Sequence, residues 1–156
     1  MKKVTVVGVL MAALLCWPVK VQAAEAVFPR THEIQVNVNE YTYEEAQLLL
    51  EIAEAEAGNQ GPDGMWLVLS VIQNRKTSEK WPEDIASVIF QSGQFYTKGM
   101  GATEITPEAH EALARIERGD VAPEIIAFEK KSSNSLDKYF TEAFTYRDHT
   151  FYTLNE

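Results

Sequence analysis

Two helical stretches joined by a turn that contains glycine and proline dominate residues 46–75 of this 156-residue chain. Residues 65–72 are apolar at nearly every position, and a helix that is hydrophobic on all sides is normally enclosed by other elements. Residues 58–64 are predicted to be a loop, with Gly58 in the left-handed conformation that ends a helix. The sequence therefore predicts a helical domain that packs around the second of these helices.

The first helix carries two similar glutamates that differ in phase. Thr42 and Glu45 have the spacing of a capping box, so the helix is predicted to begin near Tyr43. Glu54 follows the polar stripe of this helix, whereas Glu56 follows the apolar one. The helical period separates the two side chains by about 200°. We therefore expect Glu54 to be solvated and Glu56 to lie among apolar side chains.

Glu56 has the position expected of a general acid. It ends a helix, where unpaired carbonyls disfavour a further negative charge, and its apolar neighbours disfavour the ionised form. Both effects raise a carboxyl pKa, and cleavage of a glycosidic bond needs a proton donor at the leaving oxygen. The alternative interpretation is that Glu56 is a structural residue whose partner lies elsewhere in the chain.

Further helices and a small sheet are expected after residue 80. A third helix is predicted to start at residues 81–84 and to bury Ile85, Val88 and Ile89. A fourth starts at Thr106 and ends at Gly119. Residues 121–128 and 149–153 are predicted to be strands, and residues 130–146 show no clear pattern. The predicted fold class is mainly α (α+β), with a small β-sheet near the C-terminus.

The first 23 residues have the pattern of a secretory signal peptide. A basic start precedes an apolar run, and a small-residue cleavage site ends at Ala23. The apolar run is shorter than the ~20 residues of a spanning helix, which makes a membrane anchor the weaker alternative. Residues 24–41 are interpreted as a leader, with one edge strand at 34–38, and residues 42–156 as the domain. The single cysteine, Cys16, falls within the signal peptide, so no disulfide is expected.

The charge of the chain excludes several classes of partner. Removal of residues 1–23 takes away three lysines and no acid, so the net charge falls from −9 to about −12. This charge argues against nucleic acid and anionic lipid as partners. The three histidines, His32, His110 and His149, have no ligand spacing, so no metal site and no cofactor are expected.

Several short motifs carry a resemblance to a known family. They resemble the catalytic domain of spore cortex-lytic and related cell wall hydrolases of Gram-positive bacteria, the SleB/CwlJ type. The similarity extends over about residues 43–153. Its motifs are Glu56-Ala57, Asn74-Arg75, Pro82, Val88-Ile89-Phe90-Gln91, Gly93-Gln94-Phe95 and the closing His149-Thr150-Phe151-Tyr152.

The resemblance implies a fold, an activity and a site. It implies a helical lysozyme-like or lytic-transglycosylase-like domain, a secreted location at the cell wall, and cleavage of peptidoglycan glycan strands with Glu56 as the catalytic acid. Protein partners are not implied. We expect substrate-binding roles for five residues near the motifs, which are Gln94, Phe95, Tyr96, His149 and Tyr152. The alternatives are that Phe95 belongs to the core, Tyr96 to a solvated rim and His149 to the structure.

The number of carboxylates suggests the type of cleavage. A hydrolase needs a second carboxylate across the bond, whereas a lytic transglycosylase works with one glutamate. Because no second acid stands out, a lytic transglycosylase acting between N-acetylmuramic acid and N-acetylglucosamine is expected. Asp63, Glu104 and Asp148 remain candidates for a second acid, and each is otherwise a cap or a surface residue.

The chain also departs from the family pattern. Gly58-Asn59-Gln60 replaces the arginine, glycine and glutamate that commonly follow the Glu-Ala pair, and Phe128-Glu129-Lys130 replaces a late tyrosine-asparagine pair. The competing interpretations are therefore a weak or inactive wall-binding module on the same scaffold and an acidic secreted structural protein. Asn74 and Arg75 are interpreted as structural residues that tie the buried helix to a neighbouring loop.

Overall fold

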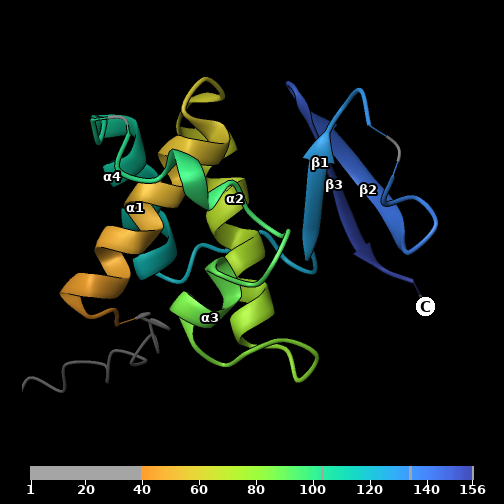
Figure 1. Ribbon diagram of the computed structural model, residues 1–156, viewed down its shortest axis with the longest axis horizontal. Helices are drawn as coiled ribbons and strands as arrows, with labels where there is room; N and C mark the ends of the chain where they lie inside the picture. The colour runs from red at the N-terminus through yellow and green to blue at the C-terminus, as the bar shows by residue number, and fades with distance from the viewer. Residues whose placement is uncertain (1–39, 103, 134, 156) are drawn as a thin grey trace, which may run out of the picture. The chain divides into compact units, whose positions relative to one another are not determined.

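The structure, a computed structural model, describes residues 40–102, 104–133 and 135–155. The predicted signal peptide and the strand predicted at 34–38 lie outside these residues, as does nearly all of the leader. Within the described residues Figure 1 shows a group of helices beside a small sheet, which confirms the predicted mainly helical α+β fold. The elements are α1 (Tyr43–Ala57), α2 (Gly61–Lys76), α3 (Ile85–Ile89), the 3-10 helix η1 (Thr97–Gly99), α4 (Pro107–Glu117), β1 (Ala127–Lys130), β2 (Phe140–Tyr146) and β3 (His149–Leu154).

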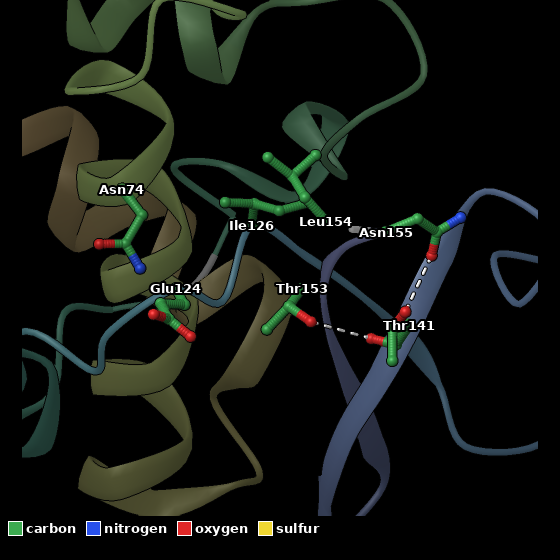
Figure 2. A pocket seen from close by; sticks show the side chains of 7 residues that line it. All are labelled: Asn74, Glu124, Ile126, Thr141, Thr153, Leu154 and Asn155. Atoms are coloured by element: carbon green, nitrogen blue, oxygen red, sulfur yellow. Dashed lines mark hydrogen bonds between the residues drawn. The ribbon is translucent and has the colours of Figure 1, made fainter.

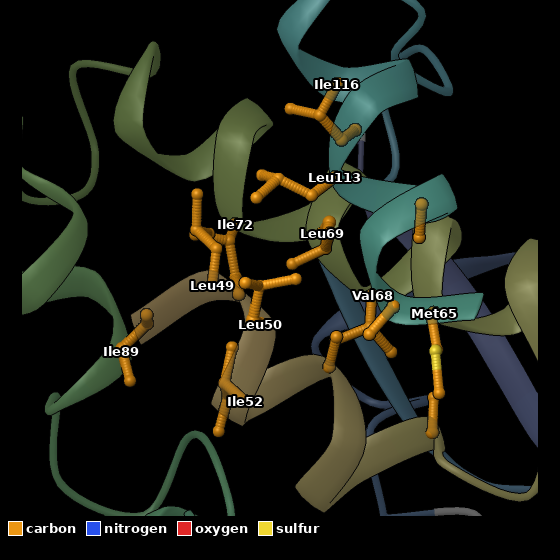
Figure 3. Close-up of a cluster of buried hydrophobic side chains, with 14 of the residues drawn as sticks. Leu49, Leu50, Ile52, Met65, Val68, Leu69, Ile72, Ile89, Leu113 and Ile116 are labelled. Atoms are coloured by element: carbon orange, nitrogen blue, oxygen red, sulfur yellow. The ribbon is translucent and has the colours of Figure 1, made fainter. Parts of the chain in front are cut away.

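Helix α2 lies at the centre of the domain. It packs against α1, α3, α4 and β1, as its continuous apolar sequence predicted. Burial of apolar side chains is the main favourable term in folding, at roughly 25 cal/mol per Å² of apolar surface removed from water. Figure 3 shows the cluster that α2 forms with its neighbours; its labelled members are Leu49, Leu50, Ile52, Met65, Val68, Leu69, Ile72, Ile89, Leu113 and Ile116.

The start of α1 is as predicted, but the turn after it is shorter than predicted. The hydroxyl of Thr42 accepts the Glu45 N–H, and the Glu45 carboxylate accepts the Thr42 N–H, which forms the capping box. The left-handed residue is Gly61 (φ 71°), and Gly58 is right-handed (φ −55°). Helix α2 therefore begins at Gly61 and not at residue 65, because Pro62 can occupy the first helical turn.

Helices α3 and α4 bury the side chains that their periodicity predicted. Helix α4 starts at Pro107, after the N-cap Thr106, whose hydroxyl accepts the Ala109 N–H. Helix α3 starts later than predicted, because Asp84, whose carboxylate accepts the Ser87 N–H, is the N-cap and not a helical residue. The buried residues of the two helices are Ile85, Val88, Ile89, Ala109, Ala112, Leu113 and Ile116.

The sheet has three antiparallel strands in the order β1-β3-β2. The strand predicted at 121–128 is a strand only from Ala127, because residues before it form an irregular segment held by α2. The Asn74 side-chain amide donates to the carbonyls of Ala122 and Ile125, both at 2.8 Å. Arg75 Nε donates to the Ile126 carbonyl at 2.6 Å. These bonds confirm the structural interpretation of Asn74 and Arg75.

Candidate functional site

Glu56 lies in the last turn of α1 beside the loop that carries η1. Its side chain is partly buried, and one carboxyl oxygen accepts a hydrogen bond from the backbone N–H of Tyr96. Burial raises the pKa of Glu56, and the Tyr96 N–H offsets part of that rise. Glu56 therefore has one fixed oxygen and a raised pKa, which suits a residue that must deliver a proton.

Glu54 is not solvated, which corrects the expectation from helical phase. Its side chain is only 7 % exposed, because the loop before α4 covers this side of α1. One carboxylate oxygen accepts both the Thr106 N–H, at 2.7 Å, and the Thr106 hydroxyl. Glu54 therefore joins α1 to the N-terminus of α4, where the helix dipole favours a negative charge.

A cavity of about 580 Å³ opens beside Glu56. Four of the six residues predicted for the site line it, namely Glu56, Gln94, Tyr96 and His149. They come from α1, from the loop after α3 and from the start of β3, so the fold brings together residues that are up to 93 positions apart. The remaining lining residues are Ala55, Asn59, Gln60, Phe128, Glu129, Lys130 and Asp148.

Phe95 and Tyr152 do not line this cavity. The Phe95 ring packs against the guanidinium of Arg75, 5.2 Å from the ring centroid, and against Phe128 at 6.0 Å. Tyr152 is 1 % exposed, and its hydroxyl hydrogen-bonds with the carboxylates of Glu129 and Asp137. Both residues thus support the cavity wall from behind, and the core interpretation of Phe95 agrees with its position.

His149 and Tyr96 both line the cavity but differ in exposure and surroundings. The His149 ring packs on Phe128 with centroids 5.2 Å apart. Burial lowers the pKa of His149; Asp148 acts to raise it, and Lys130 acts to lower it further. Its ring therefore favours the neutral form. Tyr96 is 59 % exposed, and its ring lies over Gly99, where a Cβ would come within 2.7 Å of it.

Gln60 is a site residue whose role the sequence did not reveal. It is 2 % exposed and bonds twice to Asp148 in the turn between β2 and β3. Its amide nitrogen donates to Asp148 Oδ2 at 3.2 Å, and its oxygen accepts the Asp148 N–H at 3.1 Å. Gly64 makes room for it, because a Cβ there would lie 2.3 Å from the Gln60 Cβ. Gln60 thus fixes the sheet to the turn between α1 and α2.

Of the three candidates for a second acid, only Asp148 lines the cavity beside Glu56. Asp63 pairs with Arg115 at 2.8 Å, and Glu104 does not line the cavity beside Glu56. Asp148 does line it, as does Glu129, which the sequence did not single out. Burial raises the pKa of Glu129, but hydrogen bonds from Ser135, Tyr152 and the Leu136 backbone outweigh this effect and lower it to about 2.

Two further hollows continue the cavity at either end. One, of about 360 Å³, shares Gln94 and Phe128 with it and is also lined by Arg75, Gly93, Ala127, Leu136, Tyr139 and Phe140. The other, of about 280 Å³, shares Lys130 and Asp148 with it and adds Lys131 and Ser132. The hollow beside Glu56 shares lining residues with each of the other two, which share none with each other. We therefore treat the three as one cleft with Glu56 in its middle section, an arrangement that suits a polymeric ligand.

A larger hollow of about 700 Å³ lies elsewhere, between α2 and the strands β2 and β3. Figure 2 shows that three of its polar residues bond to one another: the hydroxyl of Thr153 to the Thr141 carbonyl and that of Thr141 to the Asn155 side chain. Glu124 is its only acidic side chain. None of the six residues predicted for the site lines this hollow, so the cleft around Glu56 is the better candidate site.

Two negative findings concern the described residues only. In residues 40–102, 104–133 and 135–155 no three His, Cys, Asp or Glu side chains are grouped so that they could hold a metal ion. In the same ranges no helix has the length and apolar character needed to cross a bilayer.

Comparison with known proteins adds a family and a fold. The sequence pattern of the Cell Wall Hydrolase family matches residues 59–152, a range that begins just after Glu56. A search of curated protein sequences finds no significant match. The catalytic domain of the Bacillus cereus SleB protein is similar in structure, with a TM-score of 0.64 and 20 % identity over 74 % of this chain and 94 % of that one.

A second solved structure gives the same result. The catalytic domain of the germination-specific lytic transglycosylase SleB from Bacillus anthracis has a TM-score of 0.63 and 19 % identity. The match covers 74 % of this chain and 98 % of that one. At these identities the likeness establishes the fold, which agrees with the resemblance found in the sequence motifs.

Proposed function

The chain belongs to the cell wall hydrolase family, and on that premise we propose that it cleaves the glycan strand of peptidoglycan with Glu56 as the general acid. The observation that carries this proposal is the position of Glu56. It is a partly buried carboxyl group with a raised pKa, in the middle section of an elongated cleft. A group with these properties is a strong candidate for acid catalysis.

The hydrogen bond from Tyr96 assigns the two oxygens of Glu56 different tasks. The Tyr96 N–H occupies one oxygen, which leaves the other to carry the proton. In the proposed reaction that proton passes to the oxygen between N-acetylmuramic acid and N-acetylglucosamine, and the bond from this oxygen to the muramic acid C1 breaks. The Glu56 carboxylate is then the base for the second half of the reaction.

We propose that the second half is an internal transfer of the lytic transglycosylase type. Glu56 removes the proton from the muramic acid's own 6-hydroxyl, and that oxygen forms a new bond to C1. The proton returns to Glu56, no water is consumed, and the product ends in 1,6-anhydromuramic acid. One carboxylate is enough for this route, and neither His149, whose ring favours the neutral form, nor Gln94 would have to act as an acid.

A muramidase mechanism is the second candidate, because Asp148 and Glu129 line the same cavity as Glu56. A hydrolase uses two carboxylates on either side of the bond. Glu129 is the less suitable of the two, since Ser135, Leu136 and Tyr152 already take up its oxygens. Asp148 keeps one oxygen free of the bond with Gln60.

The test is digestion of purified peptidoglycan by residues 24–156, followed by mass spectrometry of the products. Transglycosylation predicts fragments that end in 1,6-anhydromuramic acid, and hydrolysis predicts reducing ends that are one water heavier. A Glu56→Gln variant run beside it on a zymogram should give no clearing. Clearing by that variant would remove Glu56 from the proposed role, and no clearing by either protein would favour the wall-binding module.

A likeness in fold also supports an extracellular site of action at the cell wall. We propose this location from the family and from the predicted signal peptide together. Detection of the processed protein in the wall fraction of a producing cell, by an antibody and by its N-terminal sequence, would test it. Recovery of the uncleaved chain from the cytoplasm alone would contradict it.

A further inference from the structure

Two adjacent lysines lie at one end of the cleft. Lys130 is the last residue of β1 and Lys131 follows it in the turn, and both side chains are exposed. Together with Ser132 and Asp148 they line the hollow of about 280 Å³. Because Lys130 and Asp148 also line the cavity beside Glu56, a chain molecule that leaves this cavity at that end passes the two lysines.

The two ammonium groups are available for a ligand. Both ion pairs found in the described part of the chain belong to Arg115, and neither lysine takes part in one. The backbone N–H of Lys131 donates to the Asp148 carbonyl at 2.7 Å, which holds the lysine segment against the turn between β2 and β3. The lysines are thus held at this position by the backbone, while their charges stay free.

The acidic groups nearby cancel only part of this positive charge. Asp148 faces the same hollow, and one of its oxygens is bonded to Gln60. The oxygens of Glu129 accept hydrogen bonds from Ser135, Leu136 and Tyr152. The ionised Glu129 lines the cavity beside Glu56 but not this hollow. Two lysines against the one carboxylate in its lining therefore give the hollow a net positive charge, on a protein whose overall charge is −9.

The other end of the cleft has a different character. Its hollow is lined mainly by apolar and aromatic side chains, among them Tyr139, which is 60 % exposed. Its one cation, Arg75, is 4 % exposed and packs against the rings of Trp81 and Phe95. The exposed Lys138 also lies at this end, with Nζ 4.7 Å from the Tyr139 ring centroid, but it does not line the hollow. Exposed cations therefore line only the hollow at the first end, and the two ends present different chemistry to a polymer.

We propose that Lys130 and Lys131 bind a carboxylate of the peptide attached to N-acetylmuramic acid, so that the enzyme prefers peptide-bearing glycan to glycan without free carboxylates. This inference rests on the proposed function of the same cleft. The sugar rings of the glycan carry no charge, and the attached peptide is the part of the polymer that offers carboxylates. Paired ammonium groups at this end of the cleft give such a carboxylate a favourable partner.

The experiment compares two forms of one substrate. Peptidoglycan is first freed of covalently attached phosphate polymers, and the carboxylates of half of it are then converted to amides. Exposed ion pairs are weak, at ~0.2–1 kcal/mol each, so the wild-type kcat/KM should fall by about 2- to 10-fold on the amidated form. The difference should shrink as salt is raised, because exposed charges are screened.

The matched variants separate local from general charge effects. K130Q/K131Q should cleave both forms equally, at about the wild-type rate for the amidated one. Lys80→Gln combined with Arg118→Gln changes the net charge by the same amount at two exposed positions that line none of the three hollows, and it should keep the wild-type preference. An unchanged preference in K130Q/K131Q would overturn the inference.

A binding measurement keeps this test independent of turnover. Glu56→Gln and the triple variant Glu56→Gln/K130Q/K131Q are sedimented with each form of peptidoglycan. If the wild type cleaves neither form but amidation and the lysine substitutions still weaken binding, the proposed function fails and the lysine site stands. Equal binding of both variants to both forms would overturn the lysine site.

Discussion

The two sides of the last turns of α1 place similar carboxylates in opposite situations. On one side Glu54 meets the N-terminus of α4, where Thr106 supplies a backbone N–H and a hydroxyl to one oxygen. On the other side Glu56 borders the cleft and receives one N–H, from Tyr96. The carboxylate with donors is a structural link, and the one that lacks them keeps a raised pKa.

The comparison shows that burial alone does not identify a catalytic acid. Glu54 is the more deeply buried of the two, at 7 % exposure, but its charge is matched by donors and a helix dipole. Glu56 is less buried, and fewer protein groups donate hydrogen bonds to its carboxyl group. What distinguishes a proton donor is the deficit of hydrogen-bond donors around its charge. Substitutions at Glu56, Glu54 and Tyr96 test whether this deficit separates the two glutamates, and one at Gln60 tests the wall opposite them.

Glu56→Gln should have the largest effect. Loss of a general acid lowers activity by about 10²- to 10⁴-fold, measured as products released from peptidoglycan. The fold should not suffer, because the pKa of Glu56 is raised in the folded state. A raised carboxyl pKa means that ionisation lowers stability as the pH rises above the unfolded value, so the neutral amide should be at least as stable at pH 7. A clear loss of stability in urea unfolding would contradict this assignment.

Glu54→Ala should have the opposite effect, a loss of stability without a loss of activity. It leaves the Thr106 N–H and hydroxyl without their acceptor, and bonds to a charged group contribute about 1.5–3 kcal/mol. The free energy of unfolding from urea titration should fall by that amount, while the folded protein should keep near wild-type activity. Glu51→Ala, which removes only an i,i+4 bond from Gln47, is the control and should cost about 0.5 kcal/mol or less. Equal losses in the two variants would contradict a special role for Glu54.

Gln60→Glu should destabilise the attachment of the sheet. The new carboxylate would face Asp148 Oδ2 where the Gln60 amide now donates at 3.2 Å, at an expected cost of about 1–2 kcal/mol at pH 7. Protonation of the introduced glutamate removes the repulsion, so the cost should shrink as the pH is lowered. Adding Asp148→Asn should restore stability, and a strictly additive double variant would argue against direct contact.

Tyr96→Pro should have the smallest effect, read as a difference in pH profile from Tyr96→Ala, which also lacks the ring. Tyr96 has φ −80°, close to the value that proline adopts, and proline removes the N–H that lowers the pKa of Glu56. The alkaline limb of kcat/KM, which reports loss of the acidic proton, should move to higher pH. Tyr96→Ala keeps the N–H and should leave this limb in place. The same displacement in both variants would show that the ring, not the N–H, controls Glu56.

Helical periodicity predicted the core well because packing enforces it. The residues predicted to point inward from α3 and α4 are buried, and the continuous apolar stretch is the central helix α2. Periodicity failed for Glu54 because it gives the direction of a side chain and not what covers it. The loop before α4 covers that face, and Thr106 lies 52 residues from Glu54.

The sheet was predicted in part for a related reason. Strand β2 is exposed along nearly its whole length, so it lacks the alternation of apolar and polar residues that marks a strand with one buried face. Residues 121–126 have strand-like composition, but hydrogen bonds from Asn74 and Arg75 hold their carbonyls in an irregular path. The sequence of residues 121–126 alone does not reveal that side chains of α2 will donate to their carbonyls.

The candidate site was also predicted only where short motifs were enough, and not where its structure depends on distant residues. Glu56, Gln94, Tyr96 and His149 could be proposed from motifs and were brought together by the fold. Gln60 looked like a residue of an exposed turn, and its burial depends on Asp148, 88 residues later. Nothing in the sequence near either residue indicates that they meet.

The Gln60–Asp148 contact, 88 residues apart in sequence, leads us to expect that the cleft forms late in folding. One wall, with Glu56, belongs to the helices, and the other, with His149, arrives only when the C-terminal hairpin docks on the turn between α1 and α2. Contacts between residues so far apart in sequence form slowly, because a long loop must close first. A chain still emerging from the ribosome, or one clipped before β3, therefore has its acid but no cleft to use it in.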